Sequence, residues 1–209
     1  MDIKFFLHKN KWYDWEHMLN SYNKYVNKHS IVLEIGASNI EKTKMLSKYC
    51  KKLIGVEINQ KRIPENFDNV HYIHGDWQYL SKTIKPDSID IVISSHVIEH
   101  VQYDLKAINE LYKVLKKGGI AILNTPNRKR LTRAFIEFFT GPRKFPYWEH
   151  VREYTEEDLL NLLKKSKFKN FKILPVVFGI YGGNIYIYSK SVPNIFKKWS
   201  NFWEIHLFK

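Results

Sequence analysis

The sequence predicts an α/β fold: a Rossmann-like sheet of seven strands, mostly parallel, that ends in an antiparallel hairpin and has helices on both faces. Two observations predict it. Short apolar, β-branched runs alternate with helix-compatible stretches between residues 31 and 124, as is typical of βαβ units. Farther along, two apolar runs flank the glycine pair Gly182–Gly183, which indicates a hairpin.

The elements are expected in this order. An N-terminal helical cap occupies residues 1–29, where aromatic residues recur at helical spacing. The sheet domain spans 30–190, and it carries an insertion at 126–150 and a helix at 155–166 that Thr155 caps. Five strands are expected at 31–35, 53–56, 70–73, 89–94 and 120–124, with helices at 40–50 and 105–116.

The last segment, 191–209, is expected to form an amphipathic helix. Its apolar face would hold Ile195, Phe196, Trp199, Phe202 and Trp203. Such a helix would pack on the sheet or on a second subunit, which makes a homodimer one expectation. Docking on a membrane surface is the alternative.

The composition favours one domain in a reducing compartment. The chain has 209 residues, of which 44% are hydrophobic, and one cysteine, so no intrachain disulfide can form. No apolar run approaches the ~20 residues of a membrane span, and we expect a cytoplasmic protein. The net charge of +13 would attract anionic partners, although the lysines are scattered as on an ordinary solvated surface.

The stretch Ile31–Ile40, IVLEIGASNI, predicts a turn from a strand into a helix. The free N–H groups at a helix N-terminus attract a carboxylate or phosphate. Only Gly36 is present where a dinucleotide loop needs G-x-G-x-x-G, which argues against NAD or FAD. Glu57 ends the next strand about 20 residues later, where an acid can accept both hydroxyls of a ribose. Asp76 follows the third strand, where it can accept a hydrogen bond from an adenine amino group, with Trp77 flanking the ring.

With the segments DSIDIVISSHVIEHV and LYKVLKKGGIAILNTPN, the chain resembles the class I S-adenosylmethionine-dependent methyltransferases. The ubiquinone-biosynthesis branch of small-molecule enzymes is the most similar. The resemblance covers roughly residues 30–190, and the first motif departs from it because Ser38 and Ile40 stand where glycines are common. The matching positions are Glu34, Gly36, Glu57, Asp76, Asp90, Glu99–His100 and Gly118–Gly119.

The resemblance implies S-adenosylmethionine as the cofactor. From the residues themselves we expect no metal site, because the sequence shows no His/Cys cluster and no paired-carboxylate motif. Glu34 with Gly36, Ala37 and Ser38 would line the methionine and ribose parts. The other implied cofactor contacts are Glu57 on the ribose hydroxyls, Ile58 packed on the adenine, Asp76 and Trp77 at the base, and Ser94, Ser95 and His96 beside the sulfonium.

A hydroxyl acceptor also needs a group that removes its proton, and a histidine that titrates near neutrality suits this task. His96, Glu99 and His150 are the catalytic candidates, whereas His100 is expected to fix a helix end. The insertion at 126–150 would reach over the acceptor, and its arginines and lysines, Arg143 and Lys144 among them, would recognise an anionic group.

These features predict a methyltransferase that acts at an oxygen of a small molecule, glycan or cell-envelope precursor. The net charge and the basic insertion keep an RNA methyltransferase open as an alternative. The missing glycines of the first motif keep a non-catalytic binding module open as well.

Overall fold

The computed structural model describes residues 3–7, 13–141, 149–182 and 185–209. Its main feature is a sheet of seven strands in the order β4-β3-β2-β5-β6-β10-β7. The first five strands of this order are parallel, and β10 runs antiparallel to both β6 and β7. This sheet confirms the predicted fold class. Its strands are β2 (Ile31–Ile35), β3 (Lys52–Glu57), β4 (Val70–His74), β5 (Ile89–Ser95), β6 (Leu115–Pro126), β7 (Asn170–Val176) and β10 (Phe202–Phe208).

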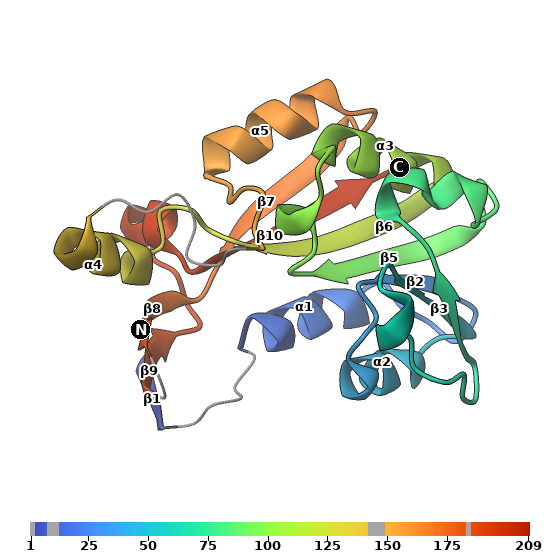
Figure 1. Ribbon diagram of the computed structural model, residues 1–209, viewed down its shortest axis with the longest axis horizontal. Helices are drawn as coiled ribbons and strands as arrows, with labels where there is room; N and C mark the ends of the chain where they lie inside the picture. Colours follow the sequence, from blue (N-terminus) through green and yellow to red (C-terminus); the bar gives the residue numbers. More distant parts are fainter. Residues whose placement is uncertain (1–2, 8–12, 142–148, 183–184) are drawn as a thin grey trace.

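Helices cover both faces of this sheet (Figure 1). α1 (Tyr13–Asn23) and α2 (Ile40–Ser47) lie on one face, and α3 (Asp104–Val114) and α5 (Glu156–Lys165) lie on the other. Side chains alternate accordingly: Val32 belongs to the apolar cluster of α1 and α2, and Leu33 belongs to that of α3 and α5. Burial on both faces explains why the central strands are largely apolar instead of alternating between apolar and polar residues.

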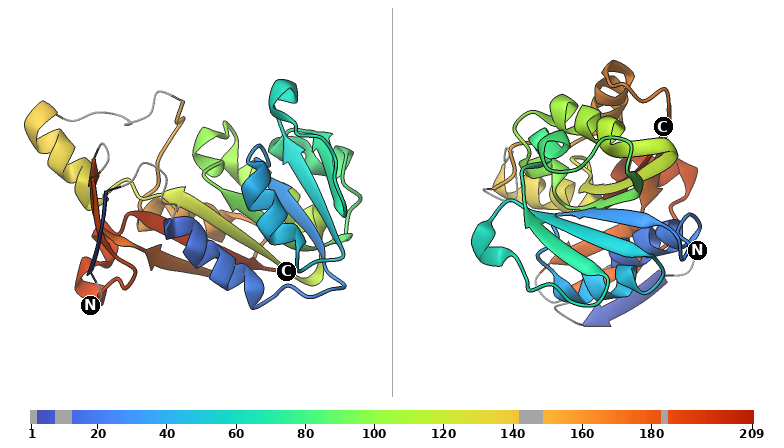
Figure 2. Two further views of the ribbon diagram at one scale, coloured as in Figure 1. Left: turned by 90° about the horizontal axis from the view of Figure 1, so that it is seen from below. Right: turned by 90° about the vertical axis from the view of Figure 1, so that its right-hand side faces the viewer.

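A second, smaller sheet stands at one end of the molecule (Figure 2). It has the order β1-β9-β8, from β1 (Ile3–Leu7), β8 (Phe178–Gly182) and β9 (Ile185–Ser189). The hairpin expected around Gly182–Gly183 therefore forms, although Gly183 lies outside the described residues and the hairpin belongs to this small sheet. The helix α4 (Leu131–Thr140), within the insertion at 126–150, packs against β8.

The expected C-terminal amphipathic helix is wrong. Residues 194–199 form a short 3-10 helix, η4 (Asn194–Trp199), and residues 202–208 form β10 in the interior of the main sheet. Trp203, Ile205 and Leu207 alternate toward one face, where they are buried. This period of two is that of a strand, so Phe202 and Trp203 belong to β10 and not to an amphipathic helix. The main sheet also extends beyond the expected domain limit at residue 190.

The other face of β10 carries a buried polar cluster. Glu204 is fully buried and accepts hydrogen bonds from Ser21 Oγ at 2.6 Å and from His206 Nε2 at 2.7 Å, and it lies 2.8 Å from His17 Nδ1. Burial opposes ionisation of this carboxyl, but the bonds from the two histidines lower its pKa to about 2. The cluster ties α1 to the sheet.

Of two smaller expectations, the structure corrects one and confirms the other. The helix expected at 105–116 forms as α3 but ends at Val114, and Lys116–Gly119 belongs to β6. The helix after Thr155 forms as expected, with a capping box between Thr155 and Asp158. Among the described residues, no helix is long and apolar enough to span a membrane.

Candidate active site

A cavity of about 410 Å³ opens where β2, β3, β4 and β5 end. The strand order reverses at this point, because the chain moves outward from β2 to β4 and then returns to place β5 on the other side of β2. Such switch points are where ligands bind in open α/β sheets. Its lining includes Glu34, Gly36, Ser38, Asn39, Lys42, Glu57, Ile58, Arg62, Asp76, Trp77, Gln78, Ser95, His96, Val97, His100 and Glu149.

The turn after β2 forms the first wall. Gly36 has φ +76°, and a Cβ at this position would lie 2.5 Å from Val97 Cγ2, so a side chain does not fit. Ser38 lines the cavity, and Asn39 caps α2 by accepting a hydrogen bond from Lys42 N. Ala37 is fully buried and does not reach the cavity, because its side chain packs toward Gly55 of β3.

Glu34 lies beneath this turn and borders the cavity. Its carboxylate accepts a hydrogen bond from Thr43 Oγ1 at 2.6 Å. Burial raises the pKa of Glu34 to about 7, and the Thr43 hydrogen bond and the charge of Lys42 only partly offset it. A buried carboxyl of this kind favours a cationic ligand.

The ends of β3 and β4 form the second wall. Glu57 is mostly buried, and its Oε1 accepts a hydrogen bond from Asn59 N at 2.9 Å. Ile58, next to it, exposes 63% of its surface and offers an apolar platform at the rim. Asp76 caps the 3-10 helix η2 (Trp77–Lys82) and accepts hydrogen bonds from Gln78.

Trp77 lies mainly in the core. It borders the cavity but is only 3% exposed, and its indole N–H donates to Ala107 O at 2.9 Å. Its ring is part of the core between the sheet and α3, because α3 packs directly on η2. The core therefore fixes the orientation of the ring, and its contact with a base in the cavity stays a prediction.

Three further candidate residues lie at the end of β5, and two of them reach the cavity. Ser94 is buried away from the cavity and Ser95 lines it; neither Oγ atom has a hydrogen-bond partner among the described residues. His96 lines the cavity in a left-handed conformation, with φ 55°. Its Nδ1 lies 3.4 Å from Glu99 Oε1, and its ring meets Phe202 edge-on. Strained backbone at a cavity wall is typical of functional sites.

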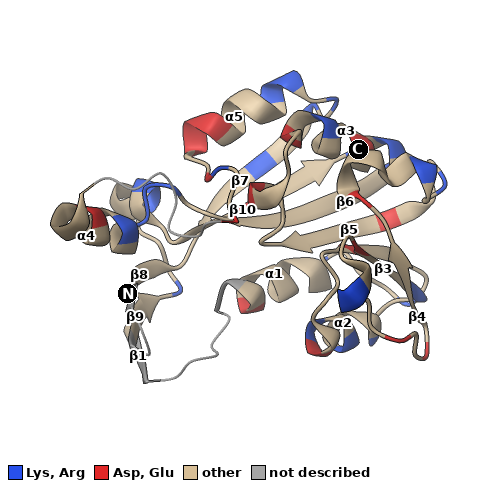
Figure 3. Cartoon of the chain, in the orientation of Figure 1, with Lys and Arg blue, Asp and Glu red and all other residues tan. Residues whose placement is uncertain are grey.

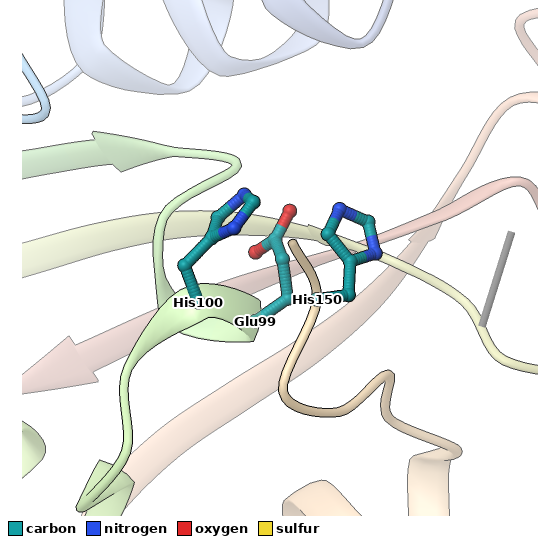
Figure 4. A group of neighbouring side chains, drawn as sticks. All are labelled: Glu99, His100 and His150. Atoms are coloured by element: carbon teal, nitrogen blue, oxygen red, sulfur yellow. The ribbon is translucent and has the colours of Figure 1, made fainter. Parts of the chain in front are cut away.

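Behind His96, Glu99 and His100 of the 3-10 helix η3 (Ile98–His100) meet His150 from the segment after the insertion. Figure 4 shows the Glu99 carboxylate between the two imidazole rings. The rings of His100 and His150 pack edge-on, with centroids 4.8 Å apart. Only His100 of the three lines the cavity.

His150 is held by a buried ionic cluster. Its Nδ1 lies 3.0 Å from Glu153 Oε1, and Glu153 also accepts hydrogen bonds from Arg130 and Arg133. Although burial raises the pKa of Glu153, the bonds from His150 and Arg130 bring it to about 2. Two of the insertion's arginines are thus committed to a structural carboxylate. Arg143 and Lys144 lie outside the described residues.

Several residues of the site were not foreseen from the sequence. His100 was assigned to a helix end, and Lys42, Arg62 and Glu149 carried no role, yet all four line the cavity. Asp90, which matches the family motif, lies at the opposite end of the sheet. There it accepts hydrogen bonds from Ile31 N and Lys116 Nζ.

Comparisons with known proteins point to one kind of domain. Residues 33–123 match a family model described as a methyltransferase domain. A probable S-adenosylmethionine-dependent methyltransferase of Mycolicibacterium smegmatis is 28% identical over 153 residues, which are 71% of this chain and 55% of that protein. The malonyl-[acyl-carrier protein] O-methyltransferase of a Marinomonas species is 26% identical over 151 residues, 68% of this chain and 54% of that protein.

Among solved structures, a methyltransferase of Thermotoga maritima, described as a possible histamine N-methyltransferase, superposes with a TM-score of 0.64. The match covers 94% of this chain and 89% of that one at 22% identity. The chain spans about half the length of the curated relatives it matches. These matches agree with the resemblance to class I S-adenosylmethionine-dependent methyltransferases: residues 33–123 match the methyltransferase-domain model, and the solved structure shares the fold.

Proposed function

Since the chain contains a methyltransferase domain with the class I fold, we propose that it binds S-adenosylmethionine and transfers the methyl group to an oxygen of a small-molecule or glycan acceptor. One observation carries the proposal. A single cavity at the switch point of the sheet collects Glu34, Gly36, Glu57 and Asp76 from three successive strand ends.

Each part of the cofactor then has a matching group on the cavity wall. The carboxylate of the methionine part meets the N-terminus of α2 beside Gly36 and Ser38, and its ammonium group pairs with Glu34. The ribose hydroxyls bind Glu57, and the adenine packs on Ile58. Asp76 accepts a hydrogen bond from the adenine amino group.

The end of the cavity at His96 is the candidate acceptor side. Methyl transfer is a displacement at carbon, so the protein contributes mainly orientation and exclusion of water. His96 accepts the hydroxyl proton of the acceptor, and Glu99, 3.4 Å away, orients the imidazole. His150 is a positioning residue in this scheme, because it does not line the cavity and is itself held by Glu153.

The charge distribution favours a small acceptor over RNA. Lysines and arginines are spread over many elements instead of gathering on one face (Figure 3). Within the insertion, Arg130 and Arg133 pair with Glu153, and Arg128 and Arg133 pair with Glu137. Arginines engaged in this way are poorly placed to track a nucleic-acid backbone.

Calorimetric titration with S-adenosylhomocysteine tests cofactor binding. Binding is expected in the wild type and a loss of at least tenfold in Glu57→Ala, with Glu65→Ala, an exposed acid on the following loop, as the matched control. If the wild type did not bind S-adenosylhomocysteine, the result would favour the non-catalytic binding module instead. Equal binding by Glu57→Ala would remove the ribose assignment.

Transfer itself is tested with labelled methyl donor and a panel of hydroxyl acceptors, with RNA as a separate arm. His96→Asn is the informative variant, because asparagine tolerates the left-handed backbone of this position but accepts no proton. We expect this variant to bind S-adenosylhomocysteine normally and to lose transfer at least a hundredfold. Transfer to RNA at low salt with none to hydroxyl acceptors would overturn the proposed acceptor class.

A further inference from the structure

The group formed by Glu99, His100 and His150 has the donor set of a metal site. Each residue offers one ligand atom, and these atoms lie within 4.8 Å of one another. Two residues come from η3 and the third comes from a segment about 50 positions later, so the fold and not the local sequence brings them together. In Figure 4 all three side chains point into the same small space.

Glu99 is the first reason to infer a ligand here. The residue is fully buried, and its carboxylate has one hydrogen bond, from Thr125 Oγ1 to Oε2 at 3.1 Å. Its Oε1 lies 3.4 Å from His96 Nδ1, beyond a well-formed hydrogen bond, and has no hydrogen-bond partner among the described residues. Burying a carboxylate is costly unless it is paired or coordinates a metal ion. By contrast, buried Glu153 and Glu204 are each held by several donors.

The outer contacts of the two histidines are the second reason. His150 Nδ1 lies 3.0 Å from Glu153 Oε1, and His100 Nδ1 lies 3.2 Å from Glu149 O. A histidine that donates from Nδ1 to a carboxylate or a carbonyl presents the lone pair of Nε2 as a ligand, and this arrangement recurs around protein-bound zinc. Glu153 is itself fixed by Arg130 and Arg133, so the orientation of His150 is strongly determined.

We propose that Glu99, His100 and His150 bind a divalent first-row transition-metal ion of the Zn²⁺ class. Two imidazoles and one carboxylate suit such ions, and three protein ligands leave one position open. At bond lengths of about 2.0–2.2 Å the ligand atoms must approach one another to roughly 3.4 Å. His100 is exposed and can make this movement by side-chain rotation.

The position of the site suggests its use. His100 and Glu149 line the cavity, so the open position of the ion borders the proposed acceptor side. An acceptor hydroxyl bound there would have a lowered pKa: its proton passes to His96, its oxygen bonds to the methyl carbon, and the carbon–sulfur bond breaks with its electrons left on sulfur. This role rests on the proposed function, whereas metal binding does not.

The test is titration of the full chain, made without a histidine tag and treated with EDTA, with Zn²⁺ by calorimetry and with Co²⁺ by visible absorption. We expect one ion per chain and cobalt bands typical of nitrogen and oxygen ligands. His150→Ala, His100→Ala and Glu99→Gln should each weaken binding at least a hundredfold. His71→Ala, an exposed histidine on β4, is the control and should bind as the wild type does.

Circular dichroism and S-adenosylhomocysteine binding are measured on the same samples, so that a misfolded variant is recognised. His100→Ala is the decisive variant if His150→Ala fails to fold, because the side chain of His100 is exposed. Absence of an ion in the wild type, or equal binding by His100→Ala, would overturn the proposal. Because cofactor binding is measured separately, either result can occur with the proposed function intact.

Discussion

Replacing Glu34 with glutamine should uncouple cofactor binding from pH. Burial raises the pKa of this carboxyl to about 7, so in the free protein it is largely protonated at pH 6. If the cofactor ammonium pairs with Glu34, the bound state requires the ionised form. Binding at low pH must then release a proton, and the affinity must fall as the pH falls.

The magnitude follows from this pKa. A group with pKa 7 that ionises on binding weakens the apparent affinity by about eightfold between pH 7.5 and pH 6.0, which is about 1.3 kcal/mol. The protein should release about 0.9 proton per cofactor at pH 6.0 and about 0.2 at pH 7.5. In Glu34→Gln the eightfold change in affinity and the release of protons should both disappear, because glutamine keeps the acceptor oxygen for Thr43 but carries no charge.

Calorimetric titration with S-adenosylhomocysteine, in buffers of different ionisation enthalpy, measures the affinity and the released protons together. Glu41→Gln is the matched control, since Glu41 lies on α2, the helix that carries Thr43, and 79% of its side chain is exposed. A wild type whose affinity is the same at both pH values would refute the pairing with Glu34. If the affinity of Glu34→Gln also changed eightfold between these pH values, the released proton would come from a different group.

Three further substitutions test the fold and the site. Gly36→Ala should weaken S-adenosylhomocysteine binding at least tenfold, because its Cβ would lie 2.5 Å from Val97 Cγ2 at a φ of +76°; calorimetry measures this, and unchanged affinity contradicts it. Trp203→Ala should lower the free energy of unfolding by about 3–5 kcal/mol in urea, and a loss below about 1 kcal/mol would show that β10 is not packed as described. The folded pKa of Glu204 is about 2, below its ordinary 4.5, so Glu204 contributes stability above pH 4.5 that is lost as the pH falls toward 2. The difference in unfolding free energy between wild type and Glu204→Gln should therefore shrink by about 3 kcal/mol from pH 6 to pH 2, and a constant difference would contradict the reasoning.

The central strands could be predicted because burial on both faces leaves an unmistakable pattern. Runs such as Ile31–Ile35 and Ile89–Ser95 are mostly apolar and β-branched, and helix-compatible stretches lie between the runs, which permits few arrangements other than a parallel sheet. The position of the last strand could not be found in this way. Apolar residues at 195, 196, 199, 202 and 203 fit a helical period by chance, and this hid the period of two from Trp203 to Leu207.

The cofactor side of the site was more accessible to sequence reasoning than the acceptor side. Glu57 and Asp76 follow strands directly, so their place at the sheet edge depends only on strand order. The orientation of Trp77 depends on how α3 packs against η2, and no local sequence pattern predicts that contact. The meeting of Glu99 with His150 depends on the path of the chain after the insertion. No cluster of ligands is visible in the sequence, and the prediction of no metal site followed from that.

The place of β10 has a consequence for how the chain is made. Within the main sheet, β7 pairs with β10 alone, and β10 is synthesised after the other six strands of this sheet. Until residue 208 has been synthesised, β6 has one unpaired edge and β7 cannot dock beside it. The parallel core can form earlier, but the completed sheet requires a contact between distant parts of the chain, and such contacts are slow to form. The nascent chain therefore exposes an unpaired edge of β6 from the synthesis of Pro126 until that of Phe208, and during that interval it should depend most on chaperones.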